Sequence, residues 1–349
     1  METPFTQLSA SAQAAYSQVL ESALSVEHAR SIADLPGSFA PKTVKGKRYW
    51  YYQYTEPSGQ LRQLYVGPDN EAVHALMARK SQPPAAEGLQ PLANAALALG
   101  CAGVIPRHYQ VIRRLADYGF FHAGGVLIGT HAFLAMGNML GVRWGDAART
   151  QDIDFAHAGK SVSLLLSQDF DVHVHRAIES LEMGLLPVAS LSSAAGASYL
   201  NPREPDFRLD FLTPCHRGGE APFEHPSLHI TLQPLKFMEF SLEDIQQAAL
   251  LSPNGVVLVN VPHPARFALH KLLVYGERTG AFAAKASKDL EQAACLLSVL
   301  KSTRPWEVQD AWADMARRGK GWLERVRRGV DAVERMYPEL GVKAWLKQS

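Results

Sequence analysis

The sequence predicts a mixed α/β (α+β) fold in three parts. In the middle of the chain, short runs of strand-forming residues alternate with longer stretches that have helical spacing. A run dense in tyrosine and tryptophan precedes this part, and an almost continuous helical pattern follows it. We therefore expect an N-terminal helix and β-hairpin module over residues 1–85, an α/β core over residues 86–262 and a C-terminal helical region over residues 263–349.

The N-terminal part begins with a segment that favours a helix. Residues 7–33 are rich in Ala, Gln, Leu and Glu and carry a partial apolar stripe. Residues 48–54 and 61–66 consist largely of strand formers on either side of a Pro-Ser-Gly turn, which predicts a β-hairpin. A short helix is expected over residues 70–79, and the proline-containing residues 82–86 are the best candidate for a linker.

The core and the C-terminal region continue this alternation. The expected elements are, in order, a helix at 107–118, a strand ending at a glycine turn near residue 129, a helix at 131–140, a polar loop at 142–149, strands at 151–156, 207–212, 227–234 and 255–261, and helices from Pro264 to Tyr337. We expect the polar loop to lie over the functional site and helices to lie between the two strands at 151–156 and 207–212.

Two acidic motifs lie on the expected strands, Thr150-Gln151-Asp152-Ile153-Asp154-Phe155 and Arg208-Leu209-Asp210-Phe211. Alternate side chains of a strand point to the same face, so Asp152 and Asp154 project together while their apolar neighbours face a core. Asp210 is also flanked by apolar residues. Three carboxylates on one sheet repel each other unless a cation neutralises them, and hard oxygen ligands suit Mg²⁺. We therefore expect Asp152, Asp154 and Asp210 to converge on one metal site.

A glycine turn, Gly129-Thr130, precedes the acids and follows the apolar run Val126-Leu127-Ile128. A strand, a glycine turn and a helix place backbone N–H groups where a phosphate can dock. Gly129 would let the backbone approach that phosphate, because a Cβ atom would crowd it. The Thr130 hydroxyl would bind a phosphate oxygen or cap the helix. Arg149 would bind phosphate or pair with a surface acid.

Taken together, these motifs resemble the nucleotidyltransferase superfamily typified by DNA polymerase β. That family has a strand, a glycine turn and a helix, then Asp-X-Asp on the next strand and a third acid on a later strand. The chain looks most like a bacterial branch that includes abortive-infection-type enzymes. In that branch a helical region follows with a Pro, an aromatic, a Lys and a later Lys-Asp pair, which Pro264, Phe267, Lys271 and Lys288-Asp289 resemble.

This resemblance implies a polymerase-β-like core and transfer of NMP from an NTP to a hydroxyl of an RNA such as tRNA, a protein or a small molecule. It implies two Mg²⁺ ions, with Mn²⁺ as an alternative, held by Asp152, Asp154 and Asp210. Asp210 would hold the catalytic ion and help to activate the acceptor. Gly129, Thr130, Arg149 and Lys271 would bind the nucleotide. Thr130 stands where a Ser is common, and the long gap before Asp210 implies inserted elements.

Other interpretations stay open from the residues alone. The rival classes are a non-catalytic protein that keeps the fold and binds nucleic acid or a partner, and a metal-dependent phosphohydrolase. His173 and His175 would share a strand face and could hold a metal, or simply pack. The tyrosine-rich hairpin would stack on nucleic-acid bases or pack against a helix. The basic residues between Arg317 and Arg328 would contact RNA or form a solvated helix face.

Composition limits these choices. The chain has 349 residues and is 47% hydrophobic and 20% charged, which is typical of a globular protein with a sizeable core. A formal net charge of +1 gives no global attraction to nucleic acid, so such binding needs a local patch. Three dispersed cysteines favour a reducing compartment. Without a recognisable signal peptide or apolar span, we expect a cytoplasmic protein, with a toxin–antitoxin or other protein partner left open.

Overall fold

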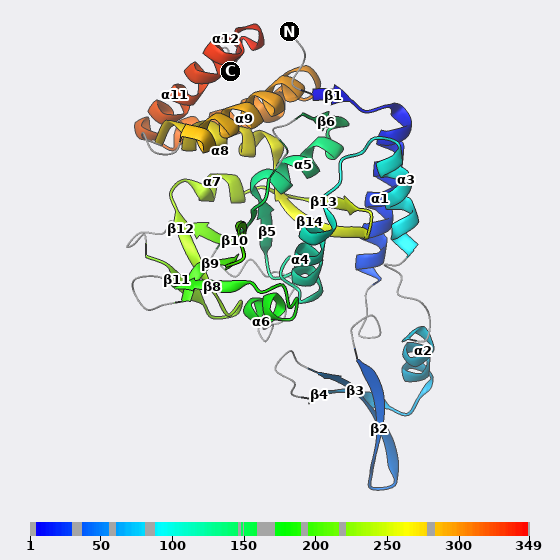
Figure 1. The fold of residues 1–349 in the computed structure, drawn as a ribbon. Coiled ribbons are helices and arrows are strands. Elements are labelled where there is room, and N and C mark those ends of the chain that lie inside the picture. The colour runs from blue at the N-terminus through cyan, green and yellow to red at the C-terminus, as the bar shows by residue number, and fades with distance from the viewer. Residues whose placement is uncertain are drawn as a thin grey trace.

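The computed structural model describes residues 5–29, 37–55, 61–80, 88–145, 148, 150–158, 172–189, 195–215, 221–277 and 283–347. These residues form a mixed α/β fold, which confirms the predicted class. Figure 1 shows a central sheet, a group of C-terminal helices beside one end of it, and a small separate sheet near the opposite end of the molecule.

The central sheet carries the acidic motifs. Its strands are β5 (Gly125–Ile128), β7 (Ile153–His157), β8 (Leu186–Ala189), β9 (Ala195–Asn201), β10 (Glu204–Pro214), β11 (Phe223–His225) and β12 (Ile230–Leu235). Their order is β11-β12-β10-β7-β5, and β9 pairs with both β10 and β8. Strands β7 and β12 run parallel to β10, whereas β9 is antiparallel to β10 and β5 is antiparallel to β7. The two predicted acidic strands are therefore neighbours.

Alternation along β7 and β10 builds the core beneath the acids. Phe155 and Phe211 stack with ring centroids 5.2 Å apart, and Phe120 meets both rings edge-on. Ile153 and Leu209 are fully buried beside them. Because the apolar residues take one face of each strand, the acidic residues between them take the other face.

Helices cover the sheet and its end. They are α4 (Pro106–Asp117), α5 (Gly129–Met139), α6 (Val174–Glu179), α7 (Met238–Leu242), α8 (Pro264–Glu277), α9 (Ala283–Thr303), α10 (Pro305–Arg317), α11 (Lys320–Met336) and α12 (Val342–Lys347), with a 3₁₀ turn at Pro338–Leu340. Helices α8 and α11 pack closely, since a Cβ atom at Gly329 would lie 2.3 Å from the Leu272 carbonyl oxygen. This packing fixes α8, which reaches the site.

A second core lies along α1 (Ala10–His28), α3 (Leu89–Ala98) and the hairpin of β13 (Ile245–Ser252) and β14 (Gly255–Pro262). Helix α1 begins later than expected because Ser9 accepts a hydrogen bond from the Ala12 N–H and the preceding residues form β1 (Phe5–Gln7). Strand β1 pairs with β6 (Val142–Trp144). The expectation of a loop from residue 142 over the site is thus wrong for β6, whose Trp144 is buried against Phe133.

The predicted hairpin is present as β3 (Lys47–Thr55) and β4 (Leu61–Pro68), followed by α2 (Glu71–Lys80). A third strand, β2 (Ser38–Val44), pairs with β3 and was not expected, since Pro41 and mostly exposed polar residues hide its strand character. In Figure 1 this sheet and α2 lie apart from the central sheet. Within the described residues, no helix combines the length and apolar character needed to cross a membrane. The three-part division of the chain stays a prediction.

Candidate active site

The acids meet where three strands of the central sheet lie side by side. Asp154 on β7 is paired with Asp210 on β10 and with Ile128 at the end of β5. Residues paired across neighbouring strands are about 4.8 Å apart along the hydrogen-bonding direction and point to the same face. Asp152, two residues before Asp154, lines the same cavity. The structure therefore brings the three predicted acids to one place.

Gly129 holds the turn against this row of acids. Its φ is +63°, a conformation that residues with a Cβ atom rarely adopt. A Cβ atom here would lie 2.1 Å from Oδ2 of Asp154 and 3.1 Å from its Cβ atom. The sequence requires glycine at this position because β5 passes into α5 directly beside the Asp154 carboxylate, so α5 begins next to the acids.

Asp210 is buried and held from two sides. Ser198 of β9 donates a hydrogen bond to its Oδ1 at 2.5 Å, and Arg208 donates from Nε to the same oxygen at 2.8 Å. Arg208 lies two residues earlier on β10, so both side chains take the same face of the strand. Arg208 thereby supplies positive charge next to this carboxylate.

Asp152 lies just before β7 and accepts a hydrogen bond from the Thr150 hydroxyl. A buried pair of histidines lies near it: His108 of α4 and His131 of α5 share a hydrogen bond of 2.9 Å between Nδ1 and Nε2. Burial lowers the pKa of His108 to about 4 and that of His131 to about 3, against a smaller opposing effect of Asp152. Both rings are therefore neutral at neutral pH, and one donates to the other.

Helices α8 and α9 bring basic residues to the acids. Lys271 of α8 pairs with Asp289 of α9 at 2.6 Å, with both side chains largely buried. Lys288, the neighbour of Asp289, lines the same cavity. Burial and the charge of Lys271 lower its pKa overall, whereas Asp152, Asp154 and Asp289 raise it by less. Lys271 thus has a carboxylate partner in Asp289, while Lys288 lies within electrostatic range of Asp152 and Asp154.

Thr130 is buried in the first turn of α5 and accepts a hydrogen bond of 3.3 Å from the Gln292 side chain of α9. The N-cap position is Ile128, and no side chain caps α5. The alternative that Thr130 caps this helix is therefore wrong. Its hydroxyl instead ties the start of α5 to α9 at the cavity wall.

These groups line one open cavity of about 510 Å³. Its polar wall contains Gly129, Thr130, Ser198, Arg208, Lys271, Lys288, Asp289 and the three acids. Its apolar wall contains Val188, Leu212, Leu235, Met238, Leu242 and Phe267. A charged wall beside an apolar wall fits a ligand that has both an anionic part and a flat or apolar part.

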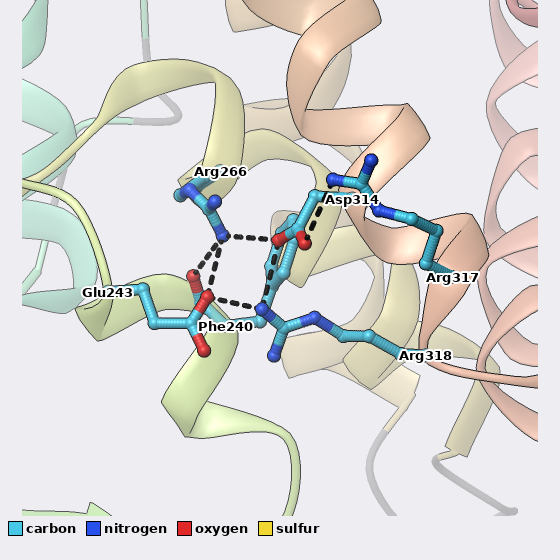
Figure 2. A network of polar contacts seen from close by, with 6 residues as sticks. All are labelled: Phe240, Glu243, Arg266, Asp314, Arg317 and Arg318. Carbon is cyan, nitrogen blue, oxygen red and sulfur yellow. Dashed lines mark hydrogen bonds and ion pairs between the residues drawn. The ribbon is translucent and has the colours of Figure 1, made fainter.

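Helix α7, which supplies Met238 and Leu242 to the apolar wall, is anchored to the C-terminal helices by an ionic network (Figure 2). Arg266 of α8 contacts Glu243 at 3.1 Å and Asp314 of α10 at 2.9 Å, and it donates to the Phe240 carbonyl. Arg318 also pairs with Asp314 and Glu243. Burial raises the pKa of Asp314, but the two arginines outweigh it and lower that pKa overall.

The oxygen atoms that line the cavity are suited to a divalent cation. Carboxylate oxygens of Asp152 and Asp154 beside a cavity are the ligands that Mg²⁺ takes, and Mg²⁺ is commonly held by one or two carboxylates with water and substrate phosphates completing its shell. Among the described residues, no group of three or more His, Cys, Asp and Glu side chains is arranged to hold an ion. The described side chains of Asp152, Asp154 and Asp210 thus do not form the expected three-carboxylate ion site by themselves, and Asp152 and Asp154 fit an ion whose shell water and a phosphate ligand complete.

Sequence reasoning found the three acids, Gly129, Thr130 and Lys271, all of which line the cavity. Arg149 lies outside the described residues. Lys288 and Asp289 belong to the Lys-Asp pair that the resemblance singled out without a role, whereas Ser198, Arg208 and Gln292 were not predicted as site residues. Only Arg208 had a local signal, its spacing of two from Asp210.

The expectation that His173 and His175 share one face of a strand is wrong, because this segment begins helix α6. His173 stacks on His229 with ring centroids 4.1 Å apart. His175 forms a hydrogen bond of 2.8 Å with the Tyr199 hydroxyl. Residues two apart in a helix point in different directions, so the two rings have separate partners.

One comparison with known proteins identifies a family for this chain. The model of a family described as Nucleotidyltransferase matches residues 107–317 of the chain, a range that includes every residue of the acidic row. Among solved structures, the chain is similar to that of an antigenic nucleotidyltransferase-like protein from Paracoccidioides brasiliensis, at 12% identity and a TM-score of 0.31, covering 65% of this chain and 95% of that chain. A search of curated proteins finds no match.

Proposed function

The chain belongs to this nucleotidyltransferase family, and on that premise we propose that it moves NMP from an NTP to a hydroxyl acceptor in a magnesium-dependent reaction. One observation carries the proposal: Asp154 is in register with Asp210 and Ile128, with Gly129 against the Asp154 carboxylate. Acids, a glycine turn and a helix N-terminus thus occupy one cavity wall. This arrangement suits a ligand that carries phosphates and cations together.

The phosphates would lie at the start of α5. Its first backbone N–H groups have no partner within the helix and, with the helix dipole, favour an anion. Lys288, which lines the same cavity, would contact the same phosphates. Lys271 would act mainly by holding Asp289 and, through it, α9 in place. Apolar residues such as Met238 and Phe267 would contact the nucleobase.

The reaction would form a bond between the acceptor oxygen and the α-phosphorus and break the bond from that phosphorus to pyrophosphate. The acceptor proton would pass to solvent, and pyrophosphate would leave with the electrons of the broken bond. Asp210, fixed through Oδ1 by Ser198 and Arg208, would orient the acceptor hydroxyl with its other oxygen. Positioning of this kind supplies most of the catalysis in phosphoryl transfer.

Asp152 and Asp154 would hold Mg²⁺ or Mn²⁺ with the phosphates, and a second ion would need Asp210 to exchange its contact with Arg208. When bound, such ions neutralise the phosphate charge that grows during transfer. A polymerase-β-like core, a bacterial origin and a cytoplasmic location are the finer parts of the proposal. They are supported by the order of the motifs and by three cysteines that form no disulfide.

Labelled substrate tests this function. The protein is incubated with each NTP labelled on the α-phosphate, Mg²⁺ and separate pools of RNA, protein and small molecules from a cell extract. We expect label to reach one pool with wild type and with Asp206→Asn, an exposed acid on the same strand as Asp210. Asp154→Asn should lose the transfer. Equal labelling by Asp154→Asn and wild type would contradict the assigned site.

A further inference from the structure

The small sheet of β2, β3 and β4 has two unlike faces. Residues paired directly across antiparallel strands lie on the same face. Trp50 and Tyr52 of β3 point to one face, where they are buried. There Trp50 lies edge-on to His74 of α2, and Lys80 of α2 donates a hydrogen bond to the Tyr52 hydroxyl at 3.1 Å. This face is occupied by the module's own helix.

The opposite face is built from tyrosines. Tyr51 is paired with Tyr65 of β4, and their ring centroids are 5.5 Å apart. Tyr49 lies 6.2 Å from the same Tyr65 ring, which is 57% exposed. We call the surface formed by Tyr49, Tyr51, Tyr65, Lys42 and Lys47 the tyrosine face. Three neighbouring rings with accessible surfaces form a platform on which flat groups can stack.

Positive charge accompanies these rings. Lys42 is paired with Tyr49, and its ammonium group lies 5.6 Å from the centre of the Tyr51 ring. Lys47 is exposed at the start of β3, on the same face by alternation. The described strands of this sheet contain no Asp or Glu. The whole chain has a formal charge of only +1, so the positive charge of this sheet is a local concentration and complements a polyanion.

We infer that the tyrosine face binds single-stranded RNA. Unpaired bases would stack on the tyrosines while the lysines contact phosphates. Gln53 and Gln63 form a cross-strand pair on this face, and their amides can both donate to and accept from a 2′-hydroxyl group. Duplex RNA keeps its bases stacked inside and does not fit this platform. The sheet lies outside the matched family region, so the inference goes beyond the proposed function and does not depend on it.

Fluorescence anisotropy with the full chain tests this inference. The probes are a labelled single-stranded RNA of mixed sequence, DNA of the same sequence and the RNA duplex. We expect binding to single-stranded RNA in the micromolar range and weaker binding to both other probes. Tyr51→Ala with Tyr65→Ala should weaken RNA binding at least about tenfold, whereas Tyr51→Phe with Tyr65→Phe should keep it, because phenylalanine retains the stacking surface.

Charge reversal provides a second variant that leaves the sheet core untouched. Lys42→Glu with Lys47→Glu should weaken binding and reduce the slope of log affinity against log salt by about 1.4, as expected for two lost phosphate contacts. The matched control is Lys320→Glu with Arg335→Glu, which changes the net charge equally at exposed positions of α11. No RNA binding by wild type, preference for the duplex or for DNA, or equal loss in both charge variants would overturn the inference.

Discussion

The cavity and the tyrosine face hold their charges in different ways. In the cavity, a half-exposed Arg208 pairs with the buried Asp210, and Lys271 pairs with Asp289 with both side chains largely buried. On the tyrosine face, Lys42 lies over the Tyr51 ring and Lys47 is exposed, on strands whose described residues include no acid. Paired, buried charges cost stability when one partner is lost and so fix geometry. Exposed charges of one sign cost little and attract a partner. The variants below separate these two uses of charge.

The largest effect is expected where a buried pair is broken. Lys271→Met removes one partner of a largely buried ion pair and should lower the free energy of unfolding by about 3 kcal/mol. Lys47→Met on the tyrosine face should change it by less than about 0.5 kcal/mol. Chemical denaturation measures the free energy of unfolding of both variants. The double variant Lys271→Met with Asp289→Leu should recover much of the lost free energy of unfolding, because it removes both charges. If Lys271→Met alone were as stable as wild type, the Lys271–Asp289 pair would not be what holds α8 and α9 together at the cavity.

Glycine substitutions sharpen the comparison for activity. Gly129→Ala should lower transfer about a hundredfold, because the new Cβ atom displaces the Asp154 carboxylate by about an ångström. Gly46→Ala in the β2–β3 turn is a matched control, since Gly46 also has a positive φ (+74°) but nothing within 4 Å of the added Cβ atom. Both variants carry the cost of a Cβ atom at positive φ, and Gly129→Ala should melt at the lower temperature because of the added clash. Full activity in Gly129→Ala would show that the close approach of the Gly129 backbone to Asp154 is not needed for transfer.

The histidine pair beside the cavity predicts a pH effect. The unfolded chain takes up a proton on His108 near pH 6.5, whereas the folded chain does so only near its lowered pKa of about 4. Stability should therefore fall as the pH drops between these values, by about 2 kcal/mol at pH 5. Denaturation curves of wild type and His108→Gln across this pH range measure how much His108 contributes to the pH dependence of the free energy of unfolding. An identical pH dependence in the variant would show that protonation of His108 does not cause the loss of stability at acidic pH.

A smaller change is expected at Lys288. Lys288→Met should raise KM for the NTP about tenfold with a smaller change in kcat, because the lysine would bind phosphates in both ground and transition states. Lys301→Met, an exposed position on the same helix, should leave KM unchanged. Steady-state kinetics of the two variants measures KM and kcat for the NTP. A fall in kcat alone would instead place Lys288 in the transition state only.

The cavity acids could be predicted because their information is local. Alternation of Asp152, Ile153, Asp154 and Phe155 defines which side chains share a face, and an apolar run before Gly129 marks the turn. Ser198 and Gln292 could not be predicted in the same way. Ser198 meets Asp210 through pairing of β9 with β10, and Gln292 meets Thr130 through helix packing. Neither contact leaves a pattern in the sequence.

The fold shows the same limit. The hairpin of β3 and β4 and the helices α4 and α5 follow from strand formers, turn residues and apolar spacing. Strand β6 was taken for a loop because its pairing with β1 joins segments far apart in the sequence. The segment after His173 alternates like a strand over three residues, yet tertiary packing makes it helix α6. Short segments carry too little local preference to decide against packing.

The most direct test of the central claim, that the acids bind Mg²⁺ and NTP in this cavity, is a thermal-shift titration. Wild type should melt at higher temperature with Mg²⁺ and one of the NTPs, and the shift should grow with ligand concentration by mass action. Asp206→Asn should behave like wild type. Asp154→Asn should melt at an equal or higher temperature without ligand, because it relieves crowded carboxylates, and should lose the shift. No Mg²⁺-dependent shift of wild type with any NTP at millimolar concentration would contradict the account.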